Sequence, residues 1–193
     1  MDKQLNLNKK LFDAIKNGDF KKFKELVSED SDISARDVAL SVAAFEGHLD
    51  LVEYLVEELG ANVNALDFDG SPPLHCIEDL DVINYLVENG ADVHIRDDEG
   101  YSTIKYAVLS SNIDVIRCLV KNGANIKEKD EDEDSLLHTA ACCGHVEVVK
   151  CLVEEYCLEI EDLNFDGQTP LDLAREKEQE EVIEYLESKM NNE

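Results

Sequence analysis

The sequence has no tryptophan and only three prolines, and aromatic residues make up just 6% of its 193 residues. This scarcity argues against a carbohydrate-binding site or an aromatic cage, which depend on aromatic rings. No stretch reaches the roughly 18 consecutive apolar residues of a membrane-spanning helix. The first six residues also lack the apolar segment of a secretory signal. We therefore expect neither membrane insertion nor export.

Basic residues are scarce as well. The 18 Lys and Arg residues are outnumbered by 45 Asp and Glu residues, which gives a formal net charge of −27. Such a surface repels phosphate backbones and anionic lipids, so nucleic acid and membrane surfaces are disfavoured as partners. The charge therefore leaves two expectations, a basic protein partner or no partner. Apolar residues still make up 44% of the chain, which is enough to build a folded core.

The six cysteines include no Cys-x-x-Cys pair. Without an export signal, reduced thiols are expected, and with them an intracellular location in the cytoplasm or nucleus. The adjacent Cys142 and Cys143 cannot easily bridge within a helix, because neighbouring side chains point apart.

Internal repeats run through the chain. Asp-Phe-Asp-Gly at 67–70 recurs with variations at 97–100 and 164–167. Gly-Ala-Asn-Val-Asn at 60–64 recurs with variations at 90–94 and 123–127. Aligning the glycine position of the turn gives residues 36, 70, 100, 133 and 167, so the period is about 33 residues.

Beyond the first repeat, each repeat also carries a version of Thr-Pro-Leu-His, as in Pro72–His75, Ser135–His138 and Thr169–Asp172. A unit of this length with this tetrapeptide resembles the ankyrin repeat. The resemblance covers about Leu7 to Leu186 and implies an all-α solenoid of about six stacked helix-turn-helix units with hairpin-like tips. We expect a single domain over 1–193. Its expected parts are an N-terminal capping repeat at 5–32, inner repeats at 33–66, 67–96, 97–129 and 130–163, and a C-terminal capping repeat at 164–193.

Several residues of one repeat have a clear chemical role in its fold. Thr169 can cap a helix through its hydroxyl group, and Pro170 suits the first helical position. Leu171 and Ala174 are expected to face inward, and the second helices carry apolar stripes at helical spacing. One repeat cannot bury both of its faces, so stability comes from stacking on neighbouring repeats.

Two repeats depart from the pattern. The third lacks about three residues between Leu74 and Leu86, which predicts a truncated first helix or a tight turn. The fifth has Glu155, Tyr156 and Cys157 where Gly-Ala is expected, so the sequence does not fix the end of its second helix.

The resemblance implies a concave binding surface made of the tips and the exposed side of each first helix. The predicted tip residues are Phe68, Asp69, Ser71, Asp98, Glu99, Tyr101, Glu131, Asp132, Asp134, Phe165, Asp166 and Gln168. The predicted first-helix residues are Phe45, Glu46, Leu109, Ser110, Cys142 and Cys143.

Four of these residues, Phe45, Phe68, Tyr101 and Phe165, would be solvent-facing aromatics. Aromatic anchors dominate protein interfaces, so together with the surrounding carboxylates they predict a groove for a basic, partly apolar segment. The alternative is that Phe68 and Phe165 pack against adjacent tips and stiffen the turns.

The sequence offers two candidate metal sites. In the acidic run 130–134, an EF-hand loop counted from Asp130 would place Ser135 at the glycine position and Ala141 at the final glutamate, so the match fails. Loose cation binding there is the alternative to a solvated tip that steers partners. In a zinc set of His138, Cys142, His145 and Cys157, both histidines already fill positions of the repeat. We expect no metal and no cofactor.

The sequence contains no phosphate loop, nucleophile elbow or His-Glu-x-x-His pattern, so we expect no enzyme. We expect a protein-binding adaptor, scaffold or stoichiometric inhibitor that is monomeric when unbound. The alternatives are an acidic chaperone or mimic that shields basic proteins, and a structural subunit of a larger assembly. Arrays resembling this one occur in cytosolic and nuclear regulators, and in bacterial or viral proteins aimed at host cells.

Overall fold

The computed structural model describes residues 2–27, 33–67, 70–75 and 77–191, with the side chains of 2–8 and 33–35 outside the description. All regular elements in the described part are helices, joined by turns. The chain divides into two compact units, Met1–Glu99 and Gly100–Glu193. None of the helices in these ranges is long and apolar enough to cross a bilayer.

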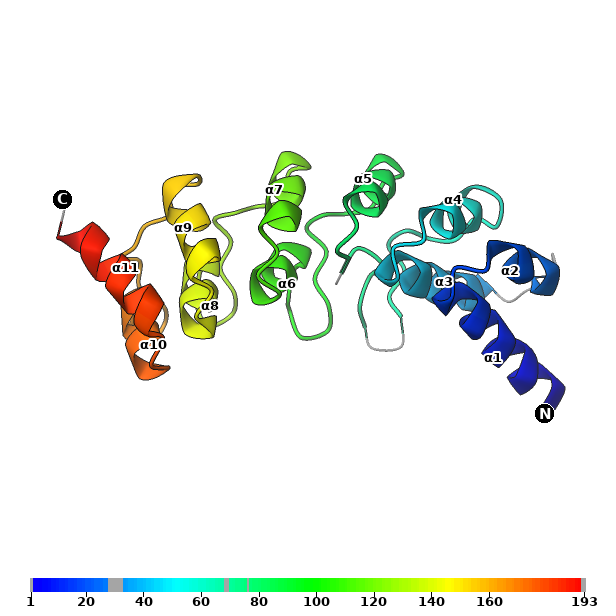
Figure 1. Ribbon diagram of the computed structural model, residues 1–193, viewed down its shortest axis with the longest axis horizontal. Helices are drawn as coiled ribbons and strands as arrows, with labels where there is room; N and C mark the ends of the chain where they lie inside the picture. Colours follow the sequence, from blue (N-terminus) through cyan, green and yellow to red (C-terminus); the bar gives the residue numbers. More distant parts are fainter. Residues whose placement is uncertain (1, 28–32, 68–69, 76, 192–193) are drawn as a thin grey trace. The chain divides into compact units, whose positions relative to one another are not determined.

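The first unit contains two helix pairs and one further helix (Figure 1). Its first helices pack on each other, as α1 does on α3, and its second helices do the same, as α4 does on α5. The elements are α1 (Asp2–Lys16), α2 (Phe20–Leu26), α3 (Ile33–Phe45), α4 (Leu49–Glu57) and α5 (Leu80–Glu88).

The second unit contains three helix pairs, and the two helices of each pair lie side by side in Figure 1. The first helices stack in the order α6, α8, α10, and the second helices in the order α7, α9, α11. The elements are α6 (Thr103–Leu109), α7 (Ile113–Lys121), α8 (Leu136–Cys143), α9 (Val146–Glu154), α10 (Pro170–Glu176) and α11 (Glu180–Met190). This architecture is the expected all-α repeat solenoid. The repeat boundaries and the count of six stay predictions.

Local sequence explains where these helices begin and what they bury. Thr169 accepts a hydrogen bond from Asp172 N, and Asp172 accepts in return from Thr169 N, which forms a capping box before Pro170. Leu171 and Ala174 are buried as predicted. The apolar stripes of the second helices are also buried, with no exposed surface on Leu51, Val52, Leu55, Val148, Val149 and Leu152. Stacked repeats thus supply the apolar cover that a single repeat lacks.

The third repeat departs from the others as predicted. Among the described residues between Glu58 and Asp79, no helix forms. A single turn replaces it, in which His75 N donates to Pro72 O at 3.0 Å. The tight turn is therefore confirmed.

Left-handed backbone conformations settle two open points of the repeat pattern. In the fifth repeat α9 ends at Glu154, and Cys157 takes the left-handed conformation (φ 52°) where glycine is usual. Glu133 does the same (φ 60°) in the aligned glycine position of its tip. Gly144 ends α8 in this conformation without the steric cost that a side chain adds. The alignment of the turns at 133 is therefore confirmed.

Candidate functional site

The tip at residues 130–134 is closed by its first residue. Asp130 accepts hydrogen bonds through Oδ1 from the backbone N–H groups of Asp132 (3.0 Å) and Asp134 (2.9 Å). Its other carboxylate oxygen lies 2.7 Å from Lys105 Nζ. Burial by itself raises the pKa of Asp130, but these hydrogen bonds outweigh burial and leave that pKa below its usual value. Asp130 is therefore a structural carboxylate.

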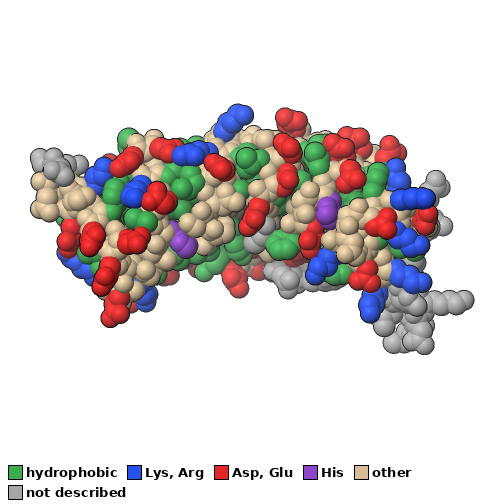
Figure 2. Space-filling view, viewed as in Figure 1, with side chains coloured by type: hydrophobic (Ala, Val, Ile, Leu, Met, Phe, Trp, Pro, Cys, Tyr) green, Lys and Arg blue, Asp and Glu red, His purple; other side chains and the backbone are tan. Residues whose placement is uncertain are grey.

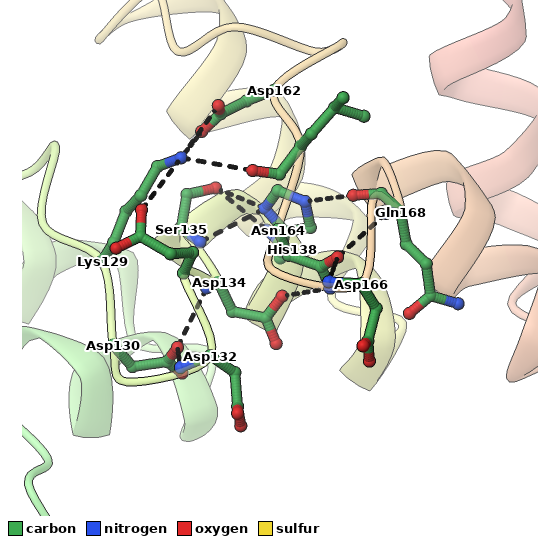
Figure 3. A network of polar contacts seen from close by, with 12 residues as sticks. Lys129, Asp130, Asp132, Asp134, Ser135, His138, Asp162, Asn164, Asp166 and Gln168 are labelled. Carbon is green, nitrogen blue, oxygen red and sulfur yellow. Dashed lines mark hydrogen bonds and ion pairs between the residues drawn. The ribbon is translucent and has the colours of Figure 1, made fainter.

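The next tip, residues 164–168, is closed in the same way by Asn164. Its Oδ1 accepts from Asp166 N (3.1 Å) and Gln168 N (2.9 Å). Its amide nitrogen donates to Asp134 Oδ1 at 2.8 Å, which joins this tip to the preceding one (Figure 3). A second link is the bond from Phe165 N to Asp132 O at 2.8 Å. The two tips thus form one hydrogen-bonded platform.

His138 on α8 fixes the tip 164–168 of this platform. The imidazole is fully buried; Nδ1 lies 2.8 Å from Ser135 Oγ, and Nε2 lies 3.0 Å from Gln168 O. Beside it, Lys129 Nζ bonds Asp162 at 2.9 Å (Figure 3). His138 and Lys129 thus each bind a residue of the next repeat, and the buried polar contacts of His138 favour a rigid arrangement.

Several side chains of the platform remain available to a partner. Phe165 is 80% exposed. Glu131, Asp132 and Asp166 are exposed, and Asp132 and Asp166 point away from the network in Figure 3. Asp134 and Gln168 are half-buried, because Asp134 binds Asn164 and Gln168 Nε2 donates to Glu176. The arrangement presents an exposed aromatic side chain on a fixed backbone, on tips that also carry exposed carboxylates.

Tyr101 differs from the expected solvent-facing ring, since it is half-buried. It meets Tyr106 edge to face at 5.9 Å, and Lys105 Nζ lies 4.1 Å from its ring centroid. A cation over an aromatic face is stabilising. Tyr101 therefore contributes to the fold of its repeat as well as to the surface.

The predicted first-helix residues of the second unit lie at the ends of α6 and α8. Leu109 is half-buried and its carbonyl lies 2.9 Å from His145 Nε2. Ser110 is exposed, and its hydroxyl donates to Tyr106 O. The carbonyl of half-buried Cys142 accepts from Gln179 Nε2 at 3.2 Å.

Cys143 is the exposed thiol of this group. Burial of the sulfur and the neighbouring Cys142 raise the pKa of Cys143, more than Lys105 lowers it. The thiol is therefore protonated at neutral pH and is a weak nucleophile. Burial raises the pKa of Cys118 and Cys151 in the same sense.

The predicted residues of the first unit are two first-helix residues and five tip residues. Phe45 is 62% exposed at the end of α3, beside half-buried Glu46. Among the described residues no hydrogen bond, ion pair or ring contact connects either of them to the tips. Phe68 and Asp69 lie outside the described residues.

The remaining three residues of the first unit belong to its tips. Ser71 is half-buried and its N donates to Asp67 Oδ1 at 3.0 Å, the same closure as in the other tips. Asp98 and Glu99 are exposed. The carboxylate of Asp98 lies so close to Gly70 that a side chain at 70 would collide with it. Two neighbouring tips of this unit therefore also touch.

The zinc set that the sequence offered contains two histidines, His138 and His145. In both, Nε2 lies within hydrogen-bond distance of a backbone carbonyl oxygen of another repeat. In the described part of the chain, no three His, Cys, Asp or Glu side chains are grouped so that they could hold a metal ion.

Sequence reasoning missed the residues that fix the tips, above all Lys105, Asp130 and Asn164. A signal was present: Asp or Asn at the first tip position, two residues before another acidic residue, is typical of a side chain that closes its own turn. The partner of Asp130 could not be read in this way, since Lys105 stands 25 residues earlier.

Charge is distributed unevenly along the chain. Seven of the 18 basic residues lie within the first 24 residues, in α1 and α2, and blue side chains gather at this end of the chain in Figure 2. Residues 37–95 contain 13 acidic residues and no Lys or Arg, and residues 100–193 contain 22 acidic and 9 basic residues. Beyond α2, both units therefore offer a negative surface to a partner.

Comparison with known families agrees with the repeats and with the helix pairs. Three overlapping segments, residues 11–97, 40–130 and 104–192, match the family described as ankyrin repeats in three copies. Arrays of this family are generally protein–protein interaction modules and are typically not enzymes. Since the matches together span nearly the whole length, the chain belongs to the ankyrin repeat family.

Proposed function

We propose that this protein binds a basic, partly apolar segment of a partner protein on the surface formed by its tips and first helices. It would act as an adaptor, scaffold or stoichiometric inhibitor inside the cell, in the cytoplasm or nucleus, and would be monomeric when unbound. The segment would place an apolar side chain on Phe165 and basic side chains beside the surrounding carboxylates.

One observation carries this proposal: Phe165 is 80% exposed while its backbone N–H is fixed to Asp132 O at 2.8 Å. A ring exposed to this extent makes little contact with the neighbouring tip, so stiffening the turn does not account for it. An exposed aromatic side chain on a fixed backbone costs little ordering entropy on binding. The exposed Glu131, Asp132 and Asp166 of the same two tips supply the negative charge that a basic segment requires.

The test is capture of partners from a lysate on immobilised protein, at about 0.15 M and about 1 M salt, with mass spectrometry. At about 1 M the Debye length is about 3 Å, so purely electrostatic capture collapses. We expect partners that the wild type retains at high salt and that Phe165→Ala loses. The control is Leu80→Ala, because Leu80 is 38% exposed but lies on α5, a second helix outside the proposed surface.

Equal recovery of the same partners by Phe165→Ala would reject the proposed surface. Capture that disappears at high salt in wild type and variants alike would favour the acidic chaperone or mimic. Folding of each variant is checked by its thermal unfolding midpoint.

A further inference from the structure

The second helices of the second unit form a different surface from the tips. An open groove of about 380 Å³ lies between α9 and α11, which are neighbours in Figure 1. Its volume falls within the range of about 300–1,000 Å³ found for ligand clefts. The lining residues are Val146, Glu147, Lys150, Glu181, Glu184 and Tyr185.

Within the second unit, two corresponding positions on the second helices, three residues apart, explain the charge of this groove. In α7 they hold Asp114 and Arg117, which form an ion pair at 3.4 Å. In α9 they hold Glu147 and Lys150, which form an ion pair at 2.7 Å. Residues three apart on a helix face the same side, so each basic residue lies beside an acidic residue of its own helix. Arg117 also bonds Glu155, at 3.0 Å from its Nε.

In α11 the same two positions hold Glu181 and Glu184, so a carboxylate replaces the cation. Both side chains are exposed, and no described Lys or Arg lies within ion-pair distance of either. Lys150 is the only lysine of the lining, and its ammonium group is bound to Glu147. The groove thus has three carboxylates for one cation.

The rest of the lining suits an aliphatic stem. Val146 offers an apolar surface, and the Tyr185 ring is held in place because its hydroxyl donates to Glu154 Oε1 at 3.1 Å. Lys189 is bound to the same Glu154 at 2.8 Å, so it does not neutralise Glu181 or Glu184. A long basic side chain can place its stem on apolar atoms while its head group meets carboxylates.

We propose that the α9–α11 groove binds an arginine side chain presented by a partner protein. The guanidinium group takes the place of the basic residue that α7 and α9 have at this position, Arg117 and Lys150. Its planar set of five donors can bind two carboxylates at once. Glu181 and Glu184 hold the head group, and Val146 and Tyr185 cover the stem. This site is separate from the tip surface and does not depend on it.

The experiment is an NMR titration of the full chain with N-acetylarginine N-methylamide, and with its neutral citrulline analogue in parallel. Saturating amide shifts are expected at Val146, Glu147 and residues 181–185, with the arginine probe only. The variant Glu181→Gln/Glu184→Gln should bind about tenfold more weakly, since it removes two exposed charge pairs.

The matched control is Asp50→Asn/Glu53→Gln, which makes the same charge change at the corresponding positions of α4. This control should leave the affinity unchanged. Shifts spread over the whole acidic surface, equal weakening by both double variants, or unchanged affinity in Glu181→Gln/Glu184→Gln would each overturn the proposal. Phe165→Ala should not affect the titration, which separates this site from the proposed tip surface.

Discussion

The ammonium group of Lys105 on α6 lies 2.7 Å from a carboxylate oxygen of Asp130 in the following tip. The two side chains are only 10% and 16% exposed. Lys105 stands at the position where other repeats carry His75 and His138. His138 fixes its repeat to the next tip, because its Nε2 lies at hydrogen-bond distance from Gln168 O. The ion pair of Lys105 with Asp130 fixes the preceding repeat to its next tip in the same way.

Replacing Lys105 should destabilise the second unit. Lys105→Met leaves the buried carboxylate of Asp130 without its cation, and removal of one partner of a buried pair costs about 3–5 kcal/mol. Because Asp130 keeps its two backbone N–H donors, we expect about 2–3 kcal/mol here. Urea unfolding followed by circular dichroism measures this change.

The matched control is Asp130→Asn, alone and combined with Lys105→Met. Asn164 fills the same position in the next tip and closes it through Oδ1, so asparagine can retain this closure. The double variant should be more stable than the two single losses imply, by about 1–2 kcal/mol. Additive losses would show that the two groups do not interact.

Stability should also fall in acid, and Asp130 should contribute to that fall. Its pKa is lowered in the folded protein, so its contribution is fully present above the unfolded pKa of about 3.9 and is lost as pH falls through the folded value. Urea unfolding at about pH 7 and about pH 3, on either side of the isoelectric point near 4.3, tests this. The loss between these pH values should be smaller in Asp130→Asn; an equal loss would contradict the assignment.

The third repeat should open more readily than its neighbours. In place of a first helix it has one turn, closed by the bond from His75 N to Pro72 O, so fewer cooperative hydrogen bonds protect its backbone. Hydrogen exchange by mass spectrometry should show faster exchange for residues 70–79 than for residues 134–143, by about tenfold or more. Uniform protection across 67–140 would refute this expectation.

Much of the fold could be predicted because the repeat signals are local. The hydroxyl of Thr169, the ring of Pro170 and the apolar spacing of Leu51, Val52 and Leu55 act within one or two helical turns. For the same reason, the missing residues of the third repeat predicted its turn. The left-handed conformation of Cys157 was not predictable, since only the surrounding structure forces a non-glycine residue into it.

The residues of the predicted surface were chosen by their position in each repeat, and not by the contacts that they make. Residues such as Asp132 and Phe165 were selected from the tips one repeat at a time, but the backbone bond between them joins different repeats. Tyr101 was expected to face solvent, and its burial depends on Tyr106 and Lys105 packing around it. Contacts of this kind require the spatial placement of side chains that no spacing rule provides.

The sequence by itself determined the repeat period, the helix pairs, the excess of negative charge and the irregular third repeat, because each follows from short-range chemistry or composition. Only the tertiary structure decided which carboxylates are used internally and which remain for a partner. Asp130 and Glu131 are neighbours with the same charge, yet one is bound to Lys105 and the other is exposed. The reason is physical: an ion pair depends on distance and burial, and stacking sets both between residues of different repeats.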